Sequence, residues 1–103
     1  MPRSYSEEFL LELQKADSNS LGVKLGRLCV EANLPSAYVA RALEVSRVTI
    51  YKWFRGHGVR ENKRRTVEVF MDLVTEDMKQ GVLPATTMFS AKLYIENMIG
   101  EKI

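Results

Sequence analysis

The chain has 103 residues, of which 46% are hydrophobic and 27% charged, and its formal net charge is +2 at pH 7. This length fits one compact domain, and the composition excludes a disordered or fibrous chain. A chain of this size leaves much of its surface exposed, so self-association would bury what a single copy cannot.

Two helices are predicted in the first third of the chain. The first runs from Ser6 to about Ala16, because apolar residues recur there at helical spacing, Ser6 is a good N-cap and acidic residues fill the first turn. After a short polar linker, the second covers 21–32 and places Leu25 and Cys29 on one side. Cys29 is therefore expected to be a small buried apolar residue rather than a reactive thiol.

Pro35 interrupts the chain and suits the first turn of a new helix. The next segment predicts two short helices a tight turn apart. The first covers 36–43, and the second starts after Ser46, which can cap it, and runs to about Phe54 or Arg55. The sequence Gly-His-Gly then ends the second helix. Two short helices joined in this way are typical of a helix-turn-helix.

Two further helices are predicted in the C-terminal half. A long one from about Arg60 to Gln80 carries an apolar stripe, and a last one from about Thr86 to Ile99 has more apolar positions than one buried stripe requires. We therefore expect an all-α fold, a bundle of about five to six helices. Its parts would be an N-terminal helix and linker at 1–20, a helix-turn-helix core at 21–80 and a C-terminal helix at 81–103, all within one compact domain.

The chain's only cysteine can form neither an internal disulfide nor, by itself, a structural zinc site. The first twenty residues mix acidic and apolar side chains, unlike a secretory signal. No stretch has the roughly 20 apolar residues that a membrane-spanning helix needs. We therefore expect a cytoplasmic protein that does not enter a membrane.

The charge is distributed unevenly along the chain. Between Ser36 and Arg65 there are eight basic and two acidic residues, a local charge of +6, and the remainder of the chain carries −4. Phosphate binding depends on locally clustered Lys and Arg rather than on overall charge. A solvated charged face would explain the same cluster, but its position around the two short helices favours a nucleic-acid interface.

Residues 36–56, SAYVARALEVSRVTIYKWFRG, resemble the helix-turn-helix of the phage repressor and Cro-like, or Xre-type, DNA-binding family. The positions that agree with the family pattern are Val39, Ala40, Leu43, Val45, Ser46, Ile50, Trp53 and Gly56. The resemblance implies a lambda-repressor-like bundle in which Ala40 is small because the second helix crosses close to it. Glu44 stands where the family often has Gly in a left-handed turn, which costs about 1 kcal/mol if that geometry is kept.

The resemblance also implies a partner, double-stranded DNA, with the second short helix, about 46–55, in the major groove. It assigns base reading to Arg47 and Lys52, which would bind guanine acceptors, and to Val48, which would touch a thymine methyl group. The residues expected at the DNA backbone are Ser36, Ser46, Thr49, Tyr51, Arg55, His57, Arg60, Lys63, Arg64 and Arg65. Partial packing would also explain Tyr51, and plain exposure would also explain His57.

The expected function is a sequence-specific, repressor-like regulator of transcription in a bacterial cell or a phage-infected host. It would act as a homodimer on a roughly palindromic site, with half-sites about 10 base pairs apart. The residues expected to oligomerise are Met88, Phe89, Tyr94, Ile95, Met98 and Ile99 of the last helix, with Phe9 and Leu13 as possible additions. The alternative for these residues is that they only close the core of a single copy.

Other functions are less well supported by the sequence. A phage DNA-packaging component such as a small terminase subunit is the alternative, because it can engage DNA through a helix-turn-helix while a helical remainder builds a ring. A third interpretation is a protein-binding module that keeps the fold but no longer binds DNA. No enzyme activity, cofactor, metal or small-molecule ligand is expected, because the one His and one Cys lie on different elements and no phosphate-binding loop is present.

Overall fold

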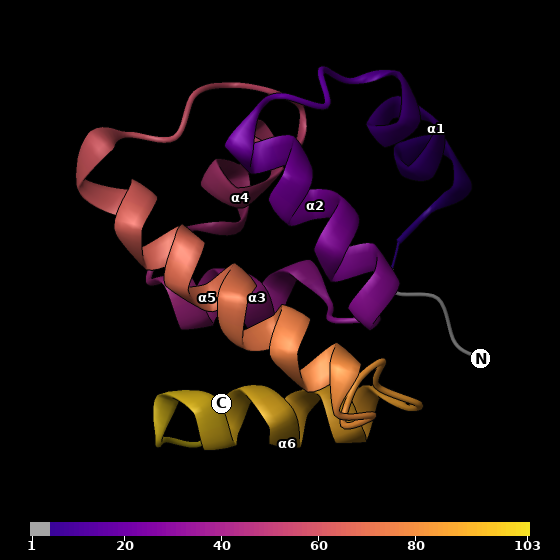
Figure 1. The fold of residues 1–103 in the computed structure, drawn as a ribbon, viewed down its shortest axis with the longest axis vertical. Coiled ribbons are helices and arrows are strands. Elements are labelled where there is room, and N and C mark those ends of the chain that lie inside the picture. The colour runs from indigo at the N-terminus through magenta and orange to yellow at the C-terminus, as the bar shows by residue number, and fades with distance from the viewer. Residues whose placement is uncertain (1–4) are drawn as a thin grey trace.

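Helices follow one another along the chain in the computed structural model, which describes residues 5–103 (Figure 1). The helices are α1 (Glu7–Lys15), α2 (Leu21–Ala32), α3 (Ser36–Leu43), α4 (Arg47–Phe54), α5 (Glu61–Lys79) and α6 (Met88–Ile99). Within the described range there is no strand, so the predicted all-α fold is confirmed. The first four residues of the N-terminal segment predicted at 1–20 lie outside the described residues.

At the starts of α1, α4 and α6, side chains satisfy some of the backbone donors that the first turn of a helix leaves open. The Ser6 hydroxyl accepts a hydrogen bond from the Phe9 N–H at 3.1 Å, and Ser46 accepts one from the Thr49 N–H at 3.1 Å. Both predicted N-caps are therefore confirmed. A capping box begins α6: the Thr87 hydroxyl accepts a hydrogen bond from the Ser90 backbone N–H, and the Ser90 hydroxyl accepts one from the Thr87 backbone N–H.

The central helix is α2, which packs on α4 and α5, whereas α3 contacts α4, α5 and α6. In Figure 1, α1 lies at the upper right, beside α2, and α6 runs along the bottom, away from α1. All six helices contribute to one hydrophobic core, and Phe54 of α4 is the largest of the fully buried side chains described. The N-terminal helix is tied to α2 because the Arg27 guanidinium donates to the Leu13 carbonyl oxygen at 3.1 Å.

Gly22 allows α2 to pack directly against the backbone of α4. A Cβ atom at this position would lie 2.2 Å from the carbonyl oxygen of Trp53 and 2.8 Å from its Cα. Four residues on, a Cβ atom at Gly26 would lie 3.0 Å from the ring of Phe54. Glycine at position 22 is therefore required for this helix crossing, which fixes how α4 is held against the core.

The apolar residues expected at an oligomer interface do not all reach the surface. Ile95 of α6 is fully buried, and Phe9 and Leu13 of α1 are 7% and 5% exposed within the same core. These three side chains close the core of a single copy, so the expectation that they face a partner is corrected. They are buried because each lies on the stripe of its helix that packs against the bundle.

The remaining residues expected at an oligomer interface are at least partly accessible. Met88 and Phe89 are exposed, Phe89 by 68%. The side chains of Tyr94, Met98 and Ile99 are half-buried against the core. The Tyr94 hydroxyl donates to a carboxylate oxygen of Asp77 in α5, and burial together with this hydrogen bond raises the pKa of Tyr94.

Two buried groups have titration behaviour that follows from their surroundings. Cys29 has no exposed surface, as predicted, and burial raises the pKa of its thiol. Tyr5 is also buried, and its hydroxyl donates to the carbonyl oxygen of Leu34 at 2.7 Å, just after α2. Desolvation raises the pKa of Tyr5 above its usual range.

None of the described helices is both long enough and apolar enough to cross a membrane.

The residue that follows α3 has a left-handed backbone conformation, which is the geometry that the resemblance to the Xre-type family implies at this position. Glu44 has φ of 57° and ψ of 45°, a conformation that disfavours residues with a Cβ atom. We expect Glu44→Gly to raise the free energy of unfolding by about 1 kcal/mol, measured by urea denaturation. Asn33→Gly is the matched control, because Asn33 is also in the left-handed conformation. Its side-chain amide donates to the Ala85 carbonyl oxygen at 2.7 Å, so this substitution loses a hydrogen bond and should not stabilise the protein. A destabilised Glu44→Gly protein would contradict this account.

Candidate nucleic-acid interface

The two short helices α3 and α4 contact each other and are joined by three residues, 44–46. Apolar residues on one side of α4 hold it in the core: Ile50 and Phe54 are fully buried and Trp53 is 4% exposed. Val45 in the turn is half-buried against the same core. The opposite side of α4 is therefore free to face a partner.

The three residues expected to read bases lie on the outer side of α4. Arg47 and Lys52 are exposed, and Val48 is 66% exposed. Val48 and Lys52 are four residues apart, so they lie on the same helix face. An apolar side chain with this exposure contributes little to the packing of its own chain, which leaves Val48 available for contact with another molecule.

Two residues expected at the DNA backbone instead make an internal contact. Ser36 is 8% exposed, and its hydroxyl donates to the Tyr51 hydroxyl at 2.8 Å. The Tyr51 ring is half-buried and packs edge-on against Phe9 and Phe54, at centroid distances of 5.5 and 5.8 Å. These contacts connect α1, α3 and α4, so Ser36 and Tyr51 help to set the orientation of α4.

Arg55, at the end of α4, also has an internal partner. Its Nε donates to a carboxylate oxygen of Glu12 in α1 at 3.4 Å, and its guanidinium lies 5.9 Å from the centre of the Tyr51 ring. Both side chains of the ion pair are 55% exposed. Solvent screens such a pair strongly, so Arg55 can exchange Glu12 for an external anion at small cost.

The basic cluster at the start of α5 is mostly exposed. Arg60, Arg64 and Arg65 are exposed, as is His57 in the preceding loop. Lys63 is half-buried, and its ammonium donates to the carbonyl oxygen of Leu43 at 3.1 Å. Lys63 therefore satisfies a carbonyl group at the end of α3, which is a structural role that the sequence did not indicate.

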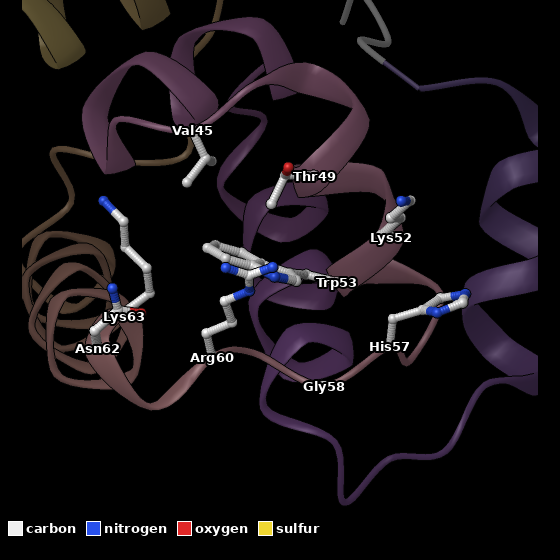
Figure 2. A pocket seen from close by; sticks show the side chains of 9 residues that line it. All are labelled: Val45, Thr49, Lys52, Trp53, His57, Gly58, Arg60, Asn62 and Lys63. Atoms are coloured by element: carbon white, nitrogen blue, oxygen red, sulfur yellow. The ribbon is translucent and has the colours of Figure 1, made fainter.

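A hollow of about 430 Å³ lies between α4 and the start of α5 (Figure 2). The residues that line it are Val45, Thr49, Lys52, Trp53, His57, Gly58, Arg60, Asn62 and Lys63. Figure 2 shows Lys63 and Asn62 on one side, Lys52 and His57 on the other, and Arg60 beside the Trp53 ring between them. The fold thus gathers one expected base reader and four expected backbone residues around one concave surface.

The sequence prediction missed two features of the site, and only one of them had a signal in the sequence. The need for glycine at position 22 depends on the path of α4, and a helical glycine in a single sequence indicates only a weak point in the helix. The burial of Phe54 had a local signal, since Ile50, Trp53 and Phe54 stand at the spacing of one helix face. Within residues 5–103, no group of three or more His, Cys, Asp or Glu side chains is placed to hold a metal ion.

Comparisons of the chain with protein-family models, with curated proteins and with solved structures found no match. The resemblance to the Xre-type family therefore remains a prediction from residues 36–56. What the molecule does must be argued from the geometry and the charge of the interface itself.

Proposed function

We propose that this protein is a sequence-specific DNA-binding regulator of transcription that inserts α4 into the major groove. The observation that carries the proposal is the two-sided character of α4. Its inner side is anchored by Ile50, Trp53 and Phe54, and its outer side presents Arg47, Val48 and Lys52 to solvent. The major groove of B-DNA accepts one α-helix, and a rigidly held helix can place side chains on base edges.

The outer residues of α4 have the chemistry that base reading requires. The Arg47 guanidinium can donate two hydrogen bonds to the O6 and N7 acceptors of guanine, and the Lys52 ammonium can donate to the same acceptors. Val48 can contact the methyl group of thymine. These interactions distinguish base pairs, whereas contacts with phosphates do not.

Exposed residues around α4 would contact the phosphates of the DNA backbone. Those that remain accessible are Ser46, Arg55, His57, Arg60, Arg64 and Arg65, together with the half-buried Thr49 and Lys63. Ser36 and Tyr51 would act indirectly, because their mutual hydrogen bond is made inside the protein. The segment 36–65 carries a net charge of +6, which suits a surface that follows phosphates.

We also propose that the regulator works as a homodimer, which would place two copies of α4 about one DNA turn, or 10 base pairs, apart. The exposed Met88 and Phe89 at the start of α6 are the best candidates for the contact between copies. A large aromatic side chain that is 68% exposed gains most from burial against a partner.

The proposal is tested by titrating the protein with DNA from its own locus and with scrambled DNA over a range of salt concentrations. Arg47→Ala and Lys52→Ala should each weaken binding to the native DNA by about 1–3 kcal/mol, and much less to scrambled DNA, because base contacts are lost. Lys79→Ala removes an equal charge at the far end of α5 and should change neither affinity by a comparable amount.

Sedimentation of the same samples then counts the subunits on each DNA duplex. Two copies on a palindromic site support the regulator. Binding that is indifferent to sequence and to both α4 substitutions, with a ring of many subunits, would reject it in favour of a packaging component.

A further inference from the structure

The hollow beside α4 has a lining suited to a small anion. Lys52, Arg60 and Lys63 contribute cationic groups, and no residue in the described lining is acidic. The two ion pairs found in the described part of the chain, Arg41 with Glu101 and Arg55 with Glu12, involve other side chains. Lys63 uses one hydrogen bond on the Leu43 carbonyl oxygen, which holds its ammonium in place and leaves its positive charge uncompensated.

Neutral donors and apolar atoms complete the lining. The Thr49 hydroxyl and the Asn62 amide lie among the cations, and both can donate to phosphate oxygens. The ring of Trp53 and the side chain of Val45 supply apolar surface. A cavity of about 430 Å³ is large enough for a phosphate group with a small organic substituent, since ligand sites in proteins begin at about 300 Å³.

The backbone at the mouth of the hollow adds to this positive potential. Helix α5 begins there, and its N-cap, Arg60, makes no side-chain hydrogen bond to the first turn. The dipole of a helix of 19 residues favours negative charge at this end, where Glu61 is the one acidic residue of the first turn and basic residues occupy positions 63–65. A bound anion reduces the repulsion among these basic side chains and interacts favourably with the helix dipole.

We propose that this hollow binds a free phosphate or small phosphate ester, with Arg60 and Lys52 as its principal ionic partners. The proposal goes beyond DNA recognition because it concerns a ligand that binds the protein in the absence of DNA. Lys52 belongs both to the hollow and to the outer side of α4. A bound phosphate ester therefore competes with DNA for Lys52 and lowers the affinity of the protein for DNA.

Trp53 is the only tryptophan of the chain and lines the hollow, so its fluorescence reports occupancy directly. The test titrates the full chain, without DNA, with inorganic pyrophosphate and, at matched ionic strength, with sodium chloride. Pyrophosphate should change the fluorescence saturably, and chloride should not. Arg60→Gln should weaken pyrophosphate binding about tenfold or more, because one charged hydrogen-bonding partner is lost.

Arg64→Gln is the matched control, since it removes the same charge from α5 at an exposed position that does not line the hollow. It should leave pyrophosphate binding within about twofold of the unsubstituted protein, as expected for a screened surface charge. Equal losses in the two variants, or equal responses to pyrophosphate and chloride, would overturn the proposal by showing only general charge attraction.

A second titration separates this ligand from the DNA backbone. Pyrophosphate should raise the Kd for native DNA in the unsubstituted protein, and in Arg60→Gln the same rise should require about tenfold more pyrophosphate or higher still. If Arg60→Gln weakens DNA binding while pyrophosphate fails to bind, the hollow serves DNA phosphates alone and the proposal is rejected. If pyrophosphate binds in an Arg60-dependent way but no DNA sequence is preferred, the ligand site stands and the proposed regulator fails.

Discussion

Gly22→Ala is expected to lower the free energy of unfolding by about 3 kcal/mol, although alanine is the better helix former. The added Cβ atom would lie 2.2 Å from the carbonyl oxygen of Trp53 and 2.6 Å from its carbonyl carbon, which real atoms do not tolerate. These neighbours are backbone atoms and cannot turn aside as a side chain can. Helix α4 must therefore move away from α2 or the variant must lose stability.

Urea denaturation measures this loss, and two other glycines provide the controls. Gly26→Ala should cost less, because its closest neighbours are the side chains of Phe54 and Leu13 at 3.0 and 3.1 Å, which can shift slightly. Gly58→Ala should be nearly neutral, since no atom lies within 4 Å of the added methyl group. A Gly22→Ala protein as stable as the unsubstituted one would show that α2 and α4 do not cross so closely.

The same substitution bears on DNA binding. Trp53 lies one residue after Lys52 on α4, so displacement of the Trp53 backbone moves the side chains that we propose read bases as well. A shift of α4 by a fraction of an ångström is enough to misplace hydrogen bonds that require donor and acceptor within about 3 Å. A folded Gly22→Ala variant should accordingly lose more affinity for native DNA than for scrambled DNA.

The helices and their ends were predictable because the signals are local. Apolar spacing and the proline at position 35 define the helices α2 and α3, whose observed bounds equal the predicted ones. Ser6 and Ser46 cap the helices that follow them. A side chain that bonds to a backbone group three residues away is visible in the sequence itself.

Contacts between distant residues were not predictable in this way. Ser36 bonds to Tyr51 across 15 residues and Lys63 to the Leu43 carbonyl oxygen across 20, so nothing in either neighbourhood identifies the partner. Periodicity showed that α6 has an apolar face, but not that Ile95 packs inside the bundle while Phe89 remains outside. The sequence thus indicated which side chains α4 exposes, whereas the hollow beside α4 depends on where α5 begins.

Phe9→Ala is expected to lower the free energy of unfolding by about 4 kcal/mol, a large part of the stability of a domain of this size. The Phe9 ring is 7% exposed and lies within ring-contact distance of Tyr5, Tyr51 and Phe54, at centroid separations of 5.2, 5.5 and 5.8 Å. Its removal leaves a cavity at the junction of α1 and α4. Chemical denaturation measures the loss. The control is Leu11→Ala in the same helix, which should cost about 0.5 kcal/mol or less because Leu11 is 55% exposed.

The dependence of this loss on protein concentration separates a core role for Phe9 from a role between copies. A residue that packs inside one copy contributes the same free energy at every concentration, whereas a residue at a dimer interface contributes more as the concentration rises. The burial of Phe9 among rings of its own chain predicts a loss that is constant from low to high micromolar protein. A loss that grows with concentration would place Phe9 at a contact between copies, and α1 would then be an oligomerisation element instead of a support for α4.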